Sequence, residues 1–260
     1  VPGRVRKLAL RVAPVLANDG RSPWDLLVRL AQMGIGARRG GRSRVSWLHL
    51  DDFLAALEWL LGEGHLDGWV NDCAPSGARP GEVMRVVREM TGRCEPGVST
   101  AENPAKQLAW SLVDRFVLIA AAGFMAPVAR RWKQQLNENS KAIAVFDELP
   151  EATHNTVVGL EQPESLRDHL AVVLISSGSD HPRNALRAQL LGDVMDTGLV
   201  WHTTVEAIGE SRLSQALSAV VLGDYVSVYL AFMYAVDPSP VVAIEHIKDQ
   251  LALADQADSE

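Results

Sequence analysis

Two uninterrupted apolar runs constrain the fold of this chain more than any other feature. Phe116–Ala121 reads FVLIAA, and Ala171–Ser176 reads AVVLIS. A strand with one face in water alternates apolar and polar residues, whereas a strand of a parallel sheet is covered on both faces and shows such continuous runs. A turn, with Gly123 in the first case, and then a helical pattern follow each run. The pattern predicts an α/β domain with a parallel sheet between helical layers.

The helices and a third strand are predicted from residue spacing. The helix that starts at Ala126 has Pro127 in its first turn and ends near residues 137–139. A third strand is expected at Leu199–Glu206, where apolar and polar residues alternate. Further helices are expected at residues 105–113, 185–197, 211–234 and 241–252. Three strands alternating with helices predict a small α/β/α sandwich.

The first 98 residues predict a smaller α/β segment that precedes this domain. Strands are expected at 7–16, 45–50 and 69–74, and helices at 24–33, at 53–62 after Asp51 and Asp52, and at 80–91 before Gly92. The loop Gly34–Arg44 is rich in Gly and Arg. It fits a solvated basic loop better than a site for a phosphate or a nucleotide sugar. His49 beside Asp51 and Asp52 has no third ligand at a recognisable spacing, so we expect no metal site.

Composition excludes several classes of protein. A formal net charge of −7 argues against a dedicated nucleic-acid binder, and 47% hydrophobic with 22% charged residues is usual for a globular protein. Two cysteines, Cys73 and Cys94, make no disulfide framework, which favours a reducing cytoplasm. The apolar run Phe116–Ala129 is too short to span a bilayer, so no membrane contact is expected. The chain begins with Val1 and is expected to be a fragment or a processed product.

Five motifs in the second part of the chain resemble a known family. They are WKQQLNENSKAIAVFDELPEATHNTVVGLE at Trp132–Glu161, SSGSDHPR at Ser176–Arg183, LGDYVSVYLA at Leu222–Ala231, VDPSPV at Val236–Val241 and IEHIKDQLA at Ile244–Ala252. Together they resemble the second sugar isomerase (SIS) subdomain of the bifunctional phosphoglucose/phosphomannose isomerases, over residues 99–252 approximately. The resemblance implies a parallel-sheet α/β/α SIS-like fold.

The resemblance also implies an aldose–ketose isomerase site. Glu138 matches the family's catalytic base, which moves a proton between C2 and C1 of the open sugar through a cis-enediol. His154 matches the histidine that helps to open the sugar ring, and Lys248 matches a lysine near the reacting oxygens. In the family the histidine comes across a dimer interface, so a homodimer is expected. Substrate contacts are expected from Gly123, Asn137, Asn155 and Arg183, with a phosphorylated hexose as substrate and without a cofactor.

A second resemblance concerns residues 1–98. VSWLHLDDFLAALEWLL at Val45–Leu61, HLDGWVNDCAPS at His65–Ser76 and GEVMRVVREMTG at Gly81–Gly92 resemble the C-terminal, substrate-side part of an extended short-chain dehydrogenase/epimerase. No strand–GxGxxG–helix unit and no Tyr-x-x-x-Lys pair accompany them. The sequence therefore shows neither the motif that binds a dinucleotide nor the catalytic tyrosine of that family. The predicted organisation is an epimerase-like segment at 1–98, a SIS domain at 99–254 and an acidic tail at 255–260.

Three functions remain open on the sequence. The first is isomerisation of glucose 6-phosphate or mannose 6-phosphate to fructose 6-phosphate. Weak or absent turnover is expected for the chain alone, because the family's Ser/Thr-rich phosphate loops do not occur before Ser99. The second is a non-catalytic SIS module that binds a phosphosugar or dimerises. The third is a fragment of an NAD(P)-dependent sugar epimerase.

Overall fold

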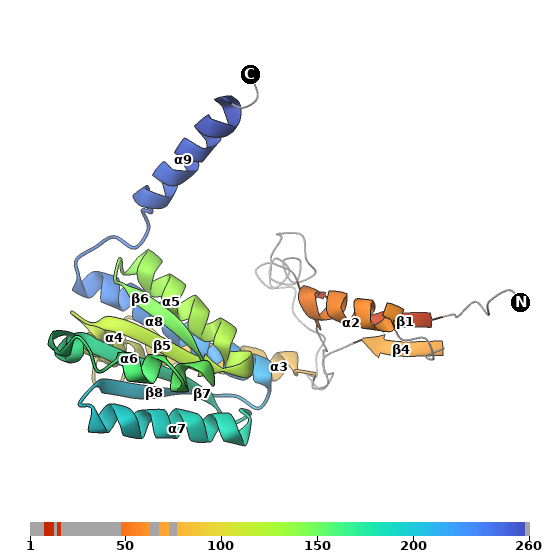
Figure 1. The fold of residues 1–260 in the computed structure, drawn as a ribbon, viewed down its shortest axis with the longest axis horizontal. Helices are drawn as coiled ribbons and strands as arrows, with labels where there is room; N and C mark the ends of the chain where they lie inside the picture. The colour runs from red at the N-terminus through yellow and green to blue at the C-terminus, as the bar shows by residue number, and fades with distance from the viewer. Residues whose placement is uncertain (1–7, 13–14, 17–47, 63–67, 73–76, 258–260) are drawn as a thin grey trace, which may run out of the picture. The chain divides into compact units, whose positions relative to one another are not determined.

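The computed structural model describes residues 8–12, 15–16, 48–62, 68–72 and 77–257. The chain divides into two compact units (Figure 1). Unit 1 comprises residues 1–85 with 209–214, and unit 2 comprises residues 86–208 with 215–260.

Among its described residues, unit 1 contains short parallel strand pairs and a helix that follows one of them. Strand β1 (Leu8–Val12) pairs with β4 (Gly68–Asp72), and β2 (Val15–Leu16) pairs with β3 (Leu48–His49). Helix α2 (Leu50–Gly62) starts before Asp51 and Asp52, so these residues lie within its first turn instead of preceding it. The helix expected at 24–33, the basic loop at 34–44 and Cys73 lie outside the described residues.

The sheet of unit 2 has four parallel strands in the order β6-β5-β7-β8. Their bounds are β5 (Phe116–Ala122), β6 (Ala144–Leu149), β7 (Leu170–Ser177) and β8 (Trp201–Ala207). The two continuous apolar runs form the two central strands, which confirms the predicted parallel α/β fold. The prediction of three strands is wrong, because β6 also pairs with β5 along its whole length and forms one edge of the sheet.

Helices cover both faces of this sheet (Figure 1). They are α4 (Pro104–Leu112), α5 (Ala126–Asn139), α6 (Thr156–Gly159), α7 (Pro182–Thr197) and α8 (Arg212–Met233), with short 3-10 turns η1 (Gly123–Met125), η2 (Glu151–Thr153) and η3 (Glu164–His169). Alternate residues of β5 divide between two apolar clusters: Val117 and Ile119 face α4, α5 and α8, whereas Leu118 and Ala120 face α6 and α7. This part of unit 2 is therefore a three-layer α/β/α sandwich.

Helix α3 (Pro80–Cys94) runs from unit 1 into unit 2. The sequence had predicted that it ends before Gly92, but the helix continues through that residue. Met90 and Cys94 lie one turn apart, are 4% and 0% exposed, and pack in the core of unit 2. Burial of these side chains outweighs the low helix propensity of the glycine between them.

Helix α8 packs against α5 and the sheet in the larger apolar cluster. Among the described helices it alone is long and apolar enough to span a membrane, but half of its most apolar window is buried within the protein. Leu222, Val226 and Leu230 pack against the sheet in the larger apolar cluster. This burial is what a core helix of an α/β sandwich requires. Residues 242–254 of the last helix, α9 (Val242–Ala257), belong to neither apolar cluster.

Candidate functional site

Glu138 lies at the end of α5, held between two anchored asparagines. The side-chain oxygen of Asn137 accepts a hydrogen bond from the amide of Ala144, the first residue of β6, at 2.7 Å. The amide nitrogen of Asn139 donates to Ser227 Oγ on α8 at 2.9 Å. Glu138 itself is exposed. The Asn–Glu–Asn motif thus ties the helix end to β6 and α8 and presents its carboxylate at the surface.

The segment that leads to α9 passes this same helix end. Lys141 donates from Nζ to the carbonyl oxygens of Glu138, at 2.6 Å, and of Pro238, at 3.4 Å. Helix α9 follows four residues after Pro238 and carries Lys248. Residues 242–254 of α9 are all exposed, Lys248 among them. The structure therefore places Lys248 on an exposed helix whose connection starts beside Glu138.

The other predicted site residues follow the carboxyl ends of the strands. Gly123 follows β5 with a φ of +53°, a left-handed conformation that favours glycine although no neighbour would meet an added Cβ. His154 and Asn155 follow β6, and both are exposed. Asn155 caps α6 by accepting from the Thr156 amide at 2.6 Å. Arg183 lies in the first turn of α7, after β7, with an exposed side chain.

One chain does not bring Glu138 and His154 together. Helix α5 runs back from the carboxyl edge of the sheet, so Glu138 lies at the amino edge, whereas His154 lies just beyond the carboxyl end of β6. β6 has six residues, and at about 3.3 Å per residue its ends lie about 20 Å apart. A site that uses both side chains therefore requires them from two copies of the chain.

A surface hollow of about 400 Å³ lies beside α5 and the edge strand β6, lined by Arg130, Lys133, Gln134, Val145 and Phe146. The Arg130 guanidinium lies 5.2 Å from the centre of the Phe146 ring. Gln134 is one helical turn before Glu138, so the hollow and the carboxylate share a face of α5. Sequence reasoning missed this site. The feature of the sequence that could have indicated it is the pair of cations Arg130 and Lys133, three residues apart on one helix.

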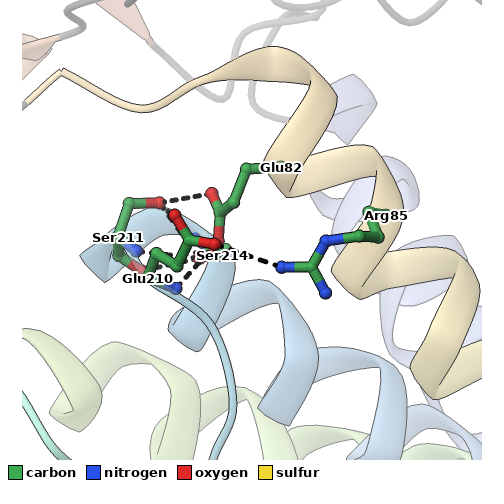
Figure 2. Close-up of polar contacts among 5 residues, drawn as sticks. All are labelled: Glu82, Arg85, Glu210, Ser211 and Ser214. Carbon is green, nitrogen blue, oxygen red and sulfur yellow. Dashed lines mark hydrogen bonds and ion pairs between the residues drawn. The ribbon is translucent and has the colours of Figure 1, made fainter.

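Another group of polar side chains, all from unit 1, surrounds the start of α8 (Figure 2). The carboxylate of Glu82 accepts hydrogen bonds from the Glu210 amide, at 2.9 Å, and from Ser211 Oγ, at 3.0 Å. Burial tends to raise the pKa of Glu82, but hydrogen bonds from Ser214, Glu210 and Ser211 outweigh it and lower the pKa. Arg85 pairs with Glu210 at 3.5 Å, and both side chains are exposed. The helix dipole favours an anion at the N-terminus of α8, and the Glu82 carboxylate already occupies that place.

Within the described part of the chain, no three His, Cys, Asp or Glu side chains gather in a way that would hold a metal ion. The described cationic and aromatic groups of the α5 hollow suit an anion instead.

Comparison with known proteins identifies relatives of unit 2. Residues 101–251 match a family model described as the bacterial phospho-glucose isomerase C-terminal SIS domain. A bifunctional phosphoglucose/phosphomannose isomerase of Caldicellulosiruptor bescii is 36% identical over 172 residues, which cover 66% of this chain and 51% of that protein. The protein of the same name from Aquifex aeolicus is 36% identical over 154 residues, which cover 59% of this chain and 48% of that protein. This chain thus spans about half the length of these relatives.

A solved structure supports the same relationship. A glucose-6-phosphate isomerase like protein from Thermus thermophilus superposes with a TM-score of 0.53 at 27% identity, over 60% of this chain and 52% of that chain. These matches support the SIS resemblance of the second part of the chain. They give no support to the dehydrogenase/epimerase resemblance of residues 1–98.

Proposed function

The chain belongs to the bacterial phospho-glucose isomerase C-terminal SIS domain family, and on that premise we propose that it contributes the catalytic half of a cytoplasmic sugar-phosphate aldose–ketose isomerase. Its substrate class is a phosphorylated hexose, either glucose 6-phosphate or mannose 6-phosphate in exchange with fructose 6-phosphate. The names of the relatives support this substrate class. In the complete site, Glu138 comes from the amino edge of the sheet of one copy. His154 comes from the carboxyl edge of the sheet of another copy.

Each proposed catalytic group has a distinct role. The Glu138 carboxylate removes the proton from C2 of the open aldose and returns it to C1, through a cis-enediol. The His154 imidazole of the second copy donates a proton to the ring oxygen as the pyranose opens, acting as a general acid. The Lys248 ammonium stabilises the negative charge that develops on the sugar oxygens. Asn137 and Asn155 are held in backbone contacts and position the neighbouring acid and base.

The observation that carries this proposal is the placement of Glu138 beside the hollow on α5. A base that takes a proton from carbon must be held within hydrogen-bond reach of its substrate. Anchored amides on both sides hold Glu138, and the hollow one turn away presents two cations and an aromatic ring. We infer that Arg130 and Lys133 attract the anionic sugar phosphate to this face of the helix.

Coupled assays with fructose 6-phosphate test the proposal. We expect slow turnover by the chain that Glu138→Gln abolishes, while Glu148→Gln, an exposed carboxylate of the edge strand, leaves the rate unchanged. Calorimetric titration with fructose 6-phosphate should show weaker binding in Arg130→Ala than in the wild type. Turnover that survives Glu138→Gln, or no binding of sugar phosphates at all, would overturn the proposed reaction.

The alternative is a SIS module that binds a phosphosugar or dimerises without catalysis. The separation of Glu138 from His154 in one chain, and the match to only half of the relatives, favour it. Binding of fructose 6-phosphate that is unchanged in Glu138→Gln, together with no detectable turnover, would select this alternative.

A further inference from the structure

Strand β6 lies at the edge of its sheet, so one side of its backbone meets no other described strand. In a parallel pair, every second residue of a strand turns both its N–H and its C=O to the neighbouring strand. The Val117 N–H of β5 donates to the Ile143 carbonyl oxygen at 3.4 Å, and Val117 is in register with Ala144. The odd-numbered residues of β6 therefore bond to β5. The even-numbered residues turn their backbone groups to the outer edge.

Side chains of the protein already accept from two of these outward N–H groups. The Ala144 N–H donates to Asn137 Oδ1 at 2.7 Å, and the Glu148 N–H donates to Asp147 Oδ1, also at 2.7 Å. Between them lies Phe146, and no group of the described residues accepts from its N–H. In the described edge of β6, the Phe146 N–H is thus the donor that is left for a ligand.

The hollow beside α5 lies over this part of the edge. Its lining includes Val145 and Phe146. The side chains of these neighbours point to opposite faces of the sheet, because Phe146 packs on the larger apolar cluster and Val145 on the smaller one. A hollow that touches both residues reaches around the outer side of the strand, where the Phe146 N–H points. Arg130, which is exposed, and Lys133, which is half-buried, line the same hollow.

We propose that the edge of β6 binds the phosphate group of the substrate, with the Phe146 N–H donating to a phosphate oxygen and with Arg130 and Lys133 supplying positive charge. A strand holds its backbone N–H in a fixed direction, and neighbouring cations strengthen the binding of an anion. The outward carbonyl groups of Ala144 and Phe146 need donors, which the hydroxyl groups of a sugar provide. The phosphate site follows from the geometry, whereas the sugar that carries the phosphate rests on the proposed function.

This site is compatible with a base at Glu138. Arg130, Gln134 and Glu138 recur every four residues and so follow one side of α5. Gln134 lies about 6 Å before Glu138 along the helix axis. The phosphate and the reacting carbons lie at opposite ends of an open hexose 6-phosphate. A phosphate held beside Gln134 therefore leaves C1 and C2 free to extend toward the Glu138 carboxylate.

NMR spectra of the full chain, titrated with inorganic phosphate at constant ionic strength, test the site without any turnover. The amide proton of Phe146 should move downfield in a saturable way, because it gains an acceptor. The amide protons of Ala144 and Glu148 are internal controls and should move less, since side chains already accept from them. A Phe146 amide proton that does not respond to phosphate, or that responds equally to chloride, would overturn the proposal.

Substitutions separate the backbone donor from the side chains. Phe146→Pro removes the N–H at an edge position, where proline is tolerated, and should weaken fructose 6-phosphate binding about tenfold in calorimetric titrations. Phe146→Ala keeps the N–H and should lose less. Lys133→Ala should also weaken binding about tenfold. Arg131→Ala is its matched control and should bind as the wild type does, because Arg131 pairs with Asp224 at 3.0 Å instead of lining the hollow. Wild-type affinity in a folded Phe146→Pro contradicts the proposed contact.

The phosphate site and the isomerase reaction fail in different ways. A response of the Phe146 amide proton to phosphate, without any turnover, supports the site and overturns the reaction. Turnover that depends on Glu138, with the KM for fructose 6-phosphate unchanged in Phe146→Pro, supports the reaction and overturns the site. If both proposals are correct, Phe146→Pro raises KM with little change in kcat, because the phosphate contact is made equally in the bound substrate and in the transition state.

Discussion

At the scale of single residues, Asn103 shows how one side chain organises a helix start. It is fully buried, and its oxygen accepts from the amides of Ala105 and Lys106 at 3.0 Å each. Its amide nitrogen donates to the carbonyl oxygen of Glu95 at 3.1 Å. The sequence predicted this helix at residues 105–113, and α4 starts one residue earlier, at Pro104, after the asparagine cap.

We expect Asn103→Ala to reduce the free energy of unfolding by about 1–2 kcal/mol, because it removes a helix cap and leaves buried groups unpaired. Urea denaturation followed by circular dichroism measures this loss. Asn103→Ser is the matched control. It keeps a side-chain oxygen that can cap the helix and adds no charge at this buried position, so its effect should be smaller. Equal effects of the two substitutions would mean that the cap contributes nothing.

Glu82 gives a prediction of pH dependence. Hydrogen bonds to its carboxylate lower its pKa in the folded protein relative to the unfolded chain. Its contribution to stability is therefore present above the ordinary pKa of glutamate, about 4.3, and is lost as the pH falls through the lower folded value.

The amide proton of Glu210, which donates to Glu82, reports this titration in NMR spectra. Its chemical shift should change with a midpoint below that of a free glutamate side chain. In Glu82→Gln the transition should disappear. A midpoint at or above the ordinary value would show that burial dominates the hydrogen bonds.

At the scale of elements, two helical glycines have opposite roles. A Cβ at Gly223 on α8 would lie 2.3 Å from Nε1 of Trp132 on α5, whose N–H donates to the carbonyl oxygen of Ala219 at 2.8 Å. A Cβ at Gly92 on α3 would meet nothing within 4 Å. Of these two glycines, only Gly223 is required by close packing, that of α5 on α8.

We expect Gly223→Ala to destabilise the protein by about 1–3 kcal/mol through overpacking. Gly92→Ala should instead stabilise it by up to about 1 kcal/mol, because alanine is the better helix former. Thermal unfolding of the two variants measures both effects against the wild type. A stabilising Gly223→Ala would show that the indole of Trp132 moves aside without loss.

The sequence predicts the central strands, the edge strand β8 and the long helices well, but it misses the other edge strand, β6. The runs of β5 and β7 are continuous because helices cover both faces, so their pattern carries the information. Strand β6 reads AVFDEL, is partly exposed, and carries two acidic residues of low strand propensity near its end. Its pairing with β5 determines its conformation. Pairing between strands that are distant in the sequence cannot be predicted from the spacing of apolar residues within one strand.

The candidate site divides in the same way. Family motifs named Glu138, His154 and Lys248, whereas the hollow of Arg130, Lys133 and Phe146 draws on a helix and on the strand that local patterns missed. A site formed between elements emerges only when their pairing is known. The domain bounds at residues 98 and 254 stay a prediction.

At the scale of the whole molecule, the separation of Glu138 and His154 makes a prediction about assembly. If two copies share each site, Glu138→Gln and His154→Ala are each inactive as pure proteins. In a random equimolar mixture about half of the dimers are mixed, and each mixed dimer has one intact site of two. Fructose 6-phosphate turnover should therefore recover to about a quarter of the wild-type rate. A mixture as inactive as its components would exclude a site shared between copies.

The paired amides beside Glu138 have a consequence for mutational libraries. Asn137 and Asn139 hold the end of α5, and with it Glu138, against a strand and a second helix. Substitutions at these two positions should therefore change the orientation of the Glu138 carboxylate even though Glu138 itself is retained. Deep mutational scanning that scores turnover would rank both asparagines as intolerant, although neither needs to meet the sugar.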